Sequence, residues 1–358
     1  MKKLDLYIIK KFLGTFFFAL ALIIAIAIVF DITDDIVDFI TSNAPLKAIV
    51  VDYYLNFIPY FANLFSSLFI FISVIYFTSR MTYNTEIVAI LSSGISFRRL
   101  LFPYFISAFI LAGLSFSLTN YIIPSANKRR LDFEEQYIRN PYRNLDRHIH
   151  KQIAPNVFIY MESYNARSNI GYKFSMERFE NKKLKEKLTS DYFRWDTIIN
   201  KLQIHNYFKR TIDSLTETIE KGRRIDTVLN ITPDDFERRN SNVETMDYFE
   251  LNEFIEKLEL QGADNIEVFK IEKYRRIASP FAAFILTLIG VSLSTRKVKG
   301  GIGLHIGTGL LLSFSYILFM QISTQFAING SFSPLMAVWT PNIIYSVIAL
   351  LLYRLAPK

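Results

Sequence analysis

The sequence predicts a membrane α-helical protein with six transmembrane helices and an outward-facing β-rich domain, either a sandwich or a barrel, between helices three and four. Three observations support this prediction. Hydrophobic residues make up 51% of the chain, they lie in long uncharged runs, and the basic residues gather in particular loops. A run of about 20 apolar residues crosses a bilayer core of roughly 30 Å as an α-helix.

The transmembrane helices are expected where the chain lacks Asp, Glu, Lys and Arg over a sufficient length. These stretches are Phe12–Phe30, Tyr53–Ser79, Leu100–Asn127, Ile277–Thr295 and Gly300–Tyr353. The last stretch is long enough for two helices, and the turn residues from Asn329 to Pro334 divide it. An acidic segment follows the first run where a signal peptide would have small residues, so we expect this run to be retained.

Basic residues in the short loops predict the orientation. One side of the predicted membrane carries Lys2, Lys3, Lys10, Lys11, Arg80, Arg98, Arg99, Arg296, Lys297, Lys299, Arg354 and Lys358. The short loops of the other side carry only Lys47. Because basic loops stay in the cytoplasm, we expect both termini to be cytoplasmic and the central segment to face outward. The net charge of +8 then reflects topology and anionic lipid, and predicts no nucleic-acid partner.

The predicted domains are residues 1–124 with three spans, the outward domain 125–276, and residues 277–358 with three more spans. Strand-like alternation of apolar and polar residues occurs at 156–162, 171–177, 201–208 and 226–232. The apolar residues of 247–260 have helical spacing, and Gly262 is a typical C-terminal stop. The outward domain is therefore expected to be β-rich, with a helix leading back to the membrane.

The sequence offers no catalytic centre. It has no cysteine, which excludes disulfides and thiolate metal sites. His148 and His150 lack a third metal ligand nearby, so a surface pair is favoured over a metal site. The glycine-rich run 300–309 lacks the Gly-Lys-Ser/Thr ending of a phosphate loop, and close helix packing explains it better. We therefore expect no enzyme activity and no cofactor, and any ATP must be bound by another subunit.

An acidic cluster follows the first predicted span. Asp31, Asp34, Asp35 and Asp38 share one face at helical spacing. Two interpretations remain open: a cation site, or the solvated end of a helix.

A short amphipathic helix is predicted at 84–96, between the second and third spans. Ile87, Ile90 and Leu91 form its apolar stripe, Glu86 lies in its first turn, and Gly94 ends it. The helix either lies on the lipid surface or docks into a groove of a cytoplasmic partner through that stripe.

Three segments resemble the LptF/LptG permease family of lipopolysaccharide exporters. They are the loop 85–96 (TEIVAILSSGIS), the segment 274–280 (YRRIASP) at the start of the fourth span, and 339–342 (WTPN) in the sixth. The six spans and the inserted outward domain are similar to that family along essentially the whole chain.

The resemblance implies a function and a set of partners. Members form a heterodimer of two related permeases in the bacterial inner membrane, driven by a dimer of a separate cytoplasmic ATPase. Lipopolysaccharide enters laterally between the first and fifth spans. It then passes through periplasmic jellyroll domains to a periplasmic bridge protein, and a single-span accessory protein contributes to the gate and bridge.

The resemblance also assigns roles to residues. Segment 84–96 corresponds to the coupling helix, with Glu86 facing the ATPase. The first and fifth spans correspond to the lateral gate, for which the candidate residues are Phe30, Asp31, Asp35, Leu311 and Phe314. One departure stands out. The family places basic residues at the outer end of the first span, where this chain has aspartates. Three explanations stay open: divalent cations that bridge these carboxylates to lipid phosphates, cations from the partner permease, or a lipid A with fewer phosphates.

Two other functions stay open at this point. A lipoprotein-releasing permease also pairs an outward domain with an external ATPase, but that class usually has four spans with the domain after the first. A membrane-bound lipid-modifying enzyme would need clustered acid–base or metal-binding residues near the outer interface, and the acidic cluster after the first span is the only candidate.

Overall fold

The computed structural model describes residues 3–138, 147–197, 201–213, 216–229, 231–233, 236, 240–262, 266–296 and 301–356. The chain divides into two compact units. A helical unit comprises Met1–Arg139, Val243–Leu251 and Glu267–Lys358, and a sheet unit comprises Asn140–Asn242 and Asn252–Ile266. Each unit is described by itself.

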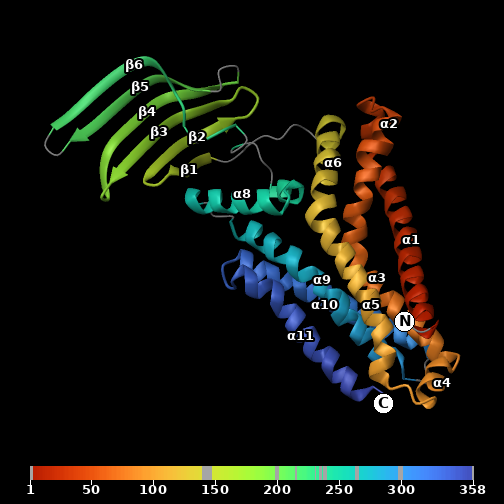
Figure 1. The fold of residues 1–358 in the computed structure, drawn as a ribbon. Helices are drawn as coiled ribbons and strands as arrows, with labels where there is room; N and C mark the ends of the chain where they lie inside the picture. Colours follow the sequence, from red (N-terminus) through yellow and green to blue (C-terminus); the bar gives the residue numbers. More distant parts are fainter. Residues whose placement is uncertain are drawn as a thin grey trace. The chain divides into compact units, whose positions relative to one another are not determined.

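The helical unit contains the long helices of Figure 1. Its elements are α1 (Lys3–Thr41), α2 (Leu46–Ala48), η1 (Ile49–Tyr54), α3 (Leu55–Tyr83), α4 (Glu86–Ser92), α5 (Phe97–Ser117), η2 (Leu118–Ile122), α6 (Ile123–Tyr137), α9 (Ile266–Ser294), α10 (Gly301–Ile328) and α11 (Pro334–Leu355). Six helical stretches among the described residues are long and apolar enough to cross a membrane, which confirms the number of spans predicted from the uncharged runs.

Two of these stretches are composite helices. The second span runs from Leu46 to Tyr83 and the third from Phe97 to Tyr137, each containing a π-helical segment, η1 or η2. The third therefore continues through the charged residues of α6, and the first segment of the helical unit extends to Arg139. The domain borders expected at 124 and 276 stay predictions.

Close helix packing in this unit depends on small residues. Helix α1 packs on α3 and α5, and α10 packs on α3 and α11. A Cβ atom added at Gly309 of α10 would lie 2.1 Å from Cδ1 of Ile75 in α3. The glycine-rich run thus allows α10 to approach α3, as the sequence suggested for helix packing.

The sheet unit contains six antiparallel strands. They are β1 (Arg147–Ala154), β2 (Val157–Asn165), β3 (Ile170–Glu180), β4 (Lys183–Asp196), β5 (Lys201–Asp213) and β6 (Thr216–Thr227). Each strand pairs with its neighbour in the chain, so the order in the sheet is β1-β2-β3-β4-β5-β6. Figure 1 shows this single sheet, coloured from olive-yellow at β1 to green at β6. The β-rich prediction is confirmed, while the jellyroll character stays a prediction.

One face of the sheet forms the core of the unit. Met161, Phe174 and Phe193 are buried there, and Ile231 and Phe236 of the segment after β6 pack on the same cluster. The strand predicted at 226–232 is therefore wrong beyond Thr227, because Leu229 and Ile231 pack on the core instead of extending the sheet, while Val228 is exposed. After the short 3-10 helix η3 (Asn240–Thr245), helix α8 (Tyr248–Gln261) occupies the place predicted for the return helix. Gly262 follows it with a φ of 63°, the left-handed stop that was expected.

Candidate functional site

Helix α4 is the short helix that the sequence predicted between the second and third spans. It covers Glu86–Ser92 and is preceded by Thr85 at a φ of 61°, with no side-chain cap. Gly94 has a φ of 84°, and its N–H donates to the carbonyl oxygen of Leu91 at 3.1 Å. Gly94 thus ends the helix in the left-handed conformation that glycine adopts without a steric penalty.

The apolar stripe of α4 faces the interior of its own chain. Ile87 is 1% exposed, and Ile90 and Leu91 are half-buried against the same apolar cluster. Ile87 is thus already covered within its own chain, and the role of Ile87, Ile90 and Leu91 in ATPase coupling stays a prediction. The side of α4 that remains available to a partner is the one opposite this stripe, where Val88 is 51% exposed.

Glu86 begins α4 and accepts hydrogen bonds within the chain. The hydroxyl of Tyr7 in α1 donates to its Oε2 and the amide of Asn84 donates to its Oε1, each at 3.3 Å. The side chain is half-buried, so one part of it remains open to a partner.

The acidic cluster lies near the other end of α1. The hydroxyl of Tyr53 donates to Asp31 at 3.3 Å and to Asp35 at 3.2 Å, and that of Tyr54 donates to Asp31 at 3.1 Å. Asp31 and Asp35 thus face η1 of their own chain, whereas Asp34 and Asp38 are exposed. Within the described part of the chain, no group of three or more His, Asp or Glu side chains could hold a metal ion.

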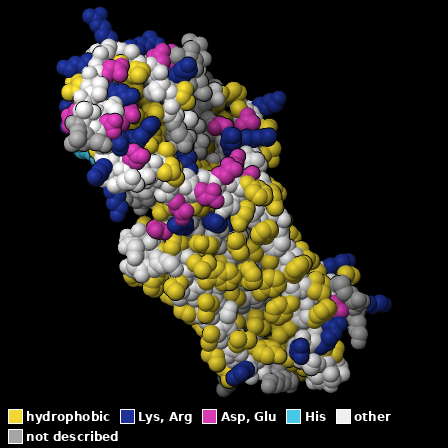
Figure 2. Space-filling view, turned by 60° about the vertical axis from the view of Figure 1, so that its left-hand side comes forward, with side chains coloured by type: hydrophobic (Ala, Val, Ile, Leu, Met, Phe, Trp, Pro, Cys, Tyr) yellow, Lys and Arg dark blue, Asp and Glu magenta, His cyan; other side chains and the backbone are white. Residues whose placement is uncertain are grey.

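The other candidate gate residues lie on open helix faces. Phe30 of α1 and Leu311 and Phe314 of α10 are all exposed. Of the six spans, α1 and α10 bury the smallest shares of their apolar stretches, 17% and 22%. Figure 2 shows a broad hydrophobic surface on the helical unit. Lipid or another protein must cover such a surface in a folded membrane protein.

The sequence interpretation missed a polar cavity of about 350 Å³ within the helical unit. Elements α3, η3, α9 and α10 contribute the side chains of Tyr60, Glu244, Glu272, Arg275, Arg276 and Gln321 to its lining. Glu272 forms ion pairs with Arg275 at 2.5 Å and with Arg276 at 3.2 Å. A cavity lined by paired charges is thus built into a mainly apolar bundle.

Glu244 is a half-buried carboxylate in the lining of this cavity. The Tyr60 hydroxyl donates to its Oε1 at 3.3 Å, and the Asn127 amide is 3.4 Å from its Oε2. Burial raises the pKa of Glu244 above its ordinary value, and the nearby Glu272 raises it further, while Arg275 and Arg130 oppose the shift. The only sequence signal for this site was the arginine pair in the segment 274–280. A basic pair before an apolar run is also a common topology signal, so its buried partners were not apparent.

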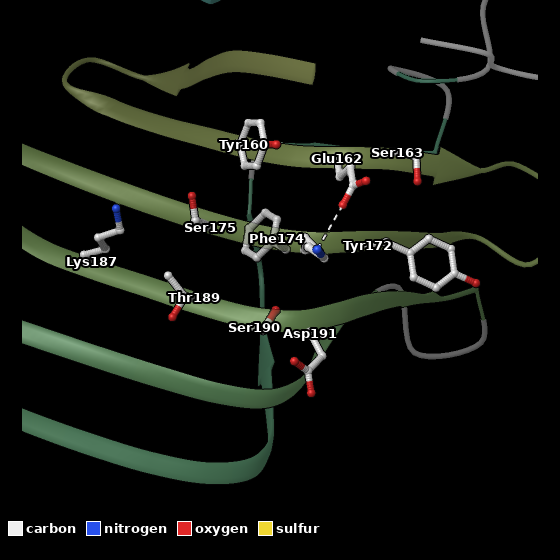
Figure 3. Close-up of a pocket in the computed structure, with 11 residues that line it drawn as sticks. Tyr160, Glu162, Ser163, Tyr172, Phe174, Ser175, Lys187, Thr189, Ser190 and Asp191 are labelled. Atoms are coloured by element: carbon white, nitrogen blue, oxygen red, sulfur yellow. Dashed lines mark ion pairs between the residues drawn. The ribbon is translucent and has the colours of Figure 1, made fainter. Parts of the chain in front are cut away.

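The sheet unit has a separate hollow of about 720 Å³ on its polar face. Figure 3 shows labelled side chains that line it, among them Tyr160, Tyr172 and Asp191. Lys173 pairs with Glu162 at 3.4 Å across the hollow, and its φ of 49° is unusual for a residue within a strand. Lys187 pairs with Glu177 at 2.6 Å. These charges are balanced within the sheet, and we assign no ligand to the hollow.

The two candidate histidines lie in β1, beside this hollow. His148 Nδ1 is 2.9 Å from the hydroxyl of Tyr160, and the His150 ring lies 4.7 Å from the Tyr160 ring. Both histidines are exposed and contact this tyrosine, and the surface-pair interpretation stays a prediction.

The chain matches one known protein family over a region that includes parts of both units. The sequence profile described as "Lipopolysaccharide export system permease LptF/LptG" matches residues 6–355, nearly the full chain. Among curated protein sequences, none matches the chain significantly. The matched region includes the whole sheet and all six spanning helices except the first three residues of α1 (Lys3–Asp5). The chain therefore belongs to the LptF/LptG family of lipopolysaccharide export permeases, which are multi-pass inner-membrane transport proteins and not enzymes.

Proposed function

We propose that this chain is one of two permease subunits of an ATP-driven transporter that extracts lipopolysaccharide, or a related glycolipid, from the inner membrane. The observation that carries the proposal is the family match over residues 6–355. Removing acyl chains from a bilayer costs about 0.8 kcal/mol per CH₂ group, so extraction requires an energy source. A separate ATPase dimer supplies it in this proposal, because the sequence contains no phosphate loop.

The ATPase binds at α4 on the cytoplasmic side. Glu86 is half-buried but still accessible, and the exposed side of α4 around Val88 offers the adjoining contact surface. The basic residues on either side of this helix, Arg80 and Arg98, are those that cytoplasmic loops favour. In this orientation both termini are cytoplasmic and the sheet unit is periplasmic.

The second permease and the substrate occupy the open faces of α1 and α10. These two spans bury the least apolar surface within the chain, and Phe30, Leu311 and Phe314 project from them. A heterodimer with a related permease would cover part of these faces and leave lateral gates for the lipid. ATP-driven closure of the space between the subunits would then expel the lipid toward the periplasm.

The sheet unit passes the lipid onward in this proposal. Within the described strands, β1 and β6 each pair on one side only, so both sheet edges offer main-chain groups for pairing with another chain. A periplasmic bridge protein and the single-span accessory protein would extend the jellyroll-like path from here.

Mass spectrometry of the lipids that co-purify with the chain tests this function. The proposal expects lipopolysaccharide or a related glycolipid, at a level reduced by replacement of Leu311 and Phe314 with aspartate. Enrichment of lipoproteins instead would support the lipoprotein-releasing alternative. Ordinary phospholipids alone, in both parent and variant, would contradict the proposal.

A further inference from the structure

The beginning of α1 is joined to the segment around α4 by polar contacts. Nη1 and Nη2 of Arg99 donate to Oδ1 and Oδ2 of Asp5 at 2.7 and 2.8 Å. Asp5 is only 1% exposed, although it carries a charge. Two residues later in α1, the Tyr7 hydroxyl donates to Glu86, the first residue of α4. Glu86, before the rest of α4, and Arg99, after α4, thus both contact the first turns of α1.

Arg99 is held in a fixed position. It lies in the first turn of α5, where its backbone N–H donates to the side chain of Ser96, and its guanidinium lies 5.3 Å from the centre of the Phe102 ring. A two-pronged pair between arginine and carboxylate fixes orientation as well as distance. The Asp5–Arg99 pair therefore restricts rotation between α1 and α5 more than a single contact would.

Apolar packing connects the same three elements. Ile8 and Phe12 of α1, Ile87 of α4 and Phe97 of α5 belong to one buried cluster. The Tyr7 ring also packs edge-on against Phe77 of α3. Because protein interiors are densely packed, α4 cannot shift without moving the beginning of α1 or opening a cavity.

Helix α1 extends far from this contact without interruption. It has 39 residues and no proline, which gives a length of roughly 60 Å at 1.5 Å per residue. By contrast, α3, α5, α9 and α11 each contain a proline, a common origin of helix kinks. The far part of α1 carries Phe30 and Asp31, two of the candidate gate residues. A displacement at its beginning is therefore transmitted to that region.

We propose that Asp5, Tyr7 and Arg99 are positioning residues that make α4 and α1 move as one body. When the ATPase displaces α4, these contacts move the gate end of α1 in the same stroke. This inference rests on the proposed function, because it needs a motor that acts on α4. A purely structural role would predict a different result: weaker folding, with the same amount of lipid released per ATP hydrolysed.

The joint motion is tested first in the chain alone. The protein has no cysteine, so spin labels attach only at introduced sites, here Val88→Cys on α4 and Leu22→Cys on α1, both exposed positions. In lipid nanodiscs we expect one narrow distance distribution for the parent and for the control Arg98→Gln. Asp5→Asn combined with Tyr7→Phe should broaden the distribution or add a second distance. An unchanged distribution in this double variant would overturn the inference.

The second test measures lipid released per ATP hydrolysed in the complete assembly with its ATPase and partner permease. Asp5→Asn and Tyr7→Phe should each retain ATP hydrolysis but lower this ratio, by at least about fivefold for Asp5→Asn. The exchange Asp5→Arg with Arg99→Asp should recover part of the loss, and Arg98→Gln should match the parent. Parent-like ratios in both single variants would overturn the inference. A parent assembly that hydrolyses ATP without releasing lipid would instead contradict the proposed function, and the spin-label result would still decide whether α4 and α1 move together.

Discussion

Arg276 of α9 donates a hydrogen bond to the carbonyl oxygen of Val243, 2.9 Å away and 33 residues earlier in the chain. A second bond reaches the carbonyl oxygen of Met246 at 2.8 Å. Arg276 is 2% exposed and also pairs with Glu272. One buried side chain thus fixes the segment 243–246 to the fourth span.

Replacing Arg276 with methionine should destabilise the helical unit strongly. The substitution leaves two carbonyl oxygens without their donor and removes one cationic partner of Glu272. Breaking a buried ion pair by removing one partner costs about 3–5 kcal/mol. Thermal unfolding of the detergent-purified chain measures the effect, with Lys273→Gln as a charge-matched control on the same helix. Equal losses in both variants would show that the contacts of Arg276 contribute little.

Glu244→Gln should stabilise the chain in a pH-dependent way. Because the pKa of Glu244 is raised in the folded chain, that chain retains a proton which the unfolded chain has released. The stability of the parent therefore falls as the pH rises from about the ordinary value of 4.5 through the raised pKa. Glutamine has no such titration, and its amide group can donate to Oδ1 of Asn127, a buried atom that has no hydrogen-bond partner among the described residues.

The measurement is the unfolding temperature of parent and Glu244→Gln across that pH window. The advantage of the variant should grow with rising pH and become constant above the raised pKa. An advantage that does not change with pH would contradict a raised pKa at Glu244.

Gly94→Ala should weaken the end of α4. No atom lies within 4 Å of the added Cβ, so the cost arises from the backbone φ of 84°. The left-handed conformation costs a residue with a side chain about 1–2 kcal/mol. Gly94→Asn should cost less, because asparagine tolerates this region better. Hydrogen exchange of the α4 amides reports the difference, and equal protection in both variants would contradict this account.

The aspartates of α1 should make transport depend on divalent cations. Carboxylates repel a phosphorylated glycolipid, and Mg²⁺ or Ca²⁺ binds oxygen atoms of both groups. Asp31→Asn with Asp35→Asn should therefore weaken the Mg²⁺ dependence of lipid release from proteoliposomes. Tyr53→Phe is a useful comparison, because it removes the hydroxyl that both carboxylates share. Identical Mg²⁺ curves for the parent and the double aspartate variant would leave these residues as an ordinary polar helix end.

The spanning helices could be predicted from the sequence because each one needs a long uncharged run. Strands β2, β3 and β5 could also be predicted, since their apolar residues alternate toward the core. Strand β6 escaped prediction for a physical reason. It lies at the sheet edge, most of its residues are exposed, and no apolar pattern is required there.

The site was less predictable than the fold. Helical spacing identified the stripe that contains Ile87 but not which surface covers it, because the covering helices come from distant parts of the chain. Asp5 and Arg99 are 94 positions apart, and Arg276 and Val243 are 33 apart. Each residue alone resembles a common loop or topology charge, so only the fold reveals the pairs.

ATP-dependent release of lipopolysaccharide from proteoliposomes tests the central claim most directly. The vesicles contain this chain with its partner permease and ATPase, together with lipopolysaccharide and a lipoprotein as competing substrates. We expect release of lipopolysaccharide that requires ATP and is lost when Glu86 is replaced with alanine, while the lipoprotein stays in the membrane. Release of the lipoprotein instead, or ATP hydrolysis with neither substrate released, would contradict the account.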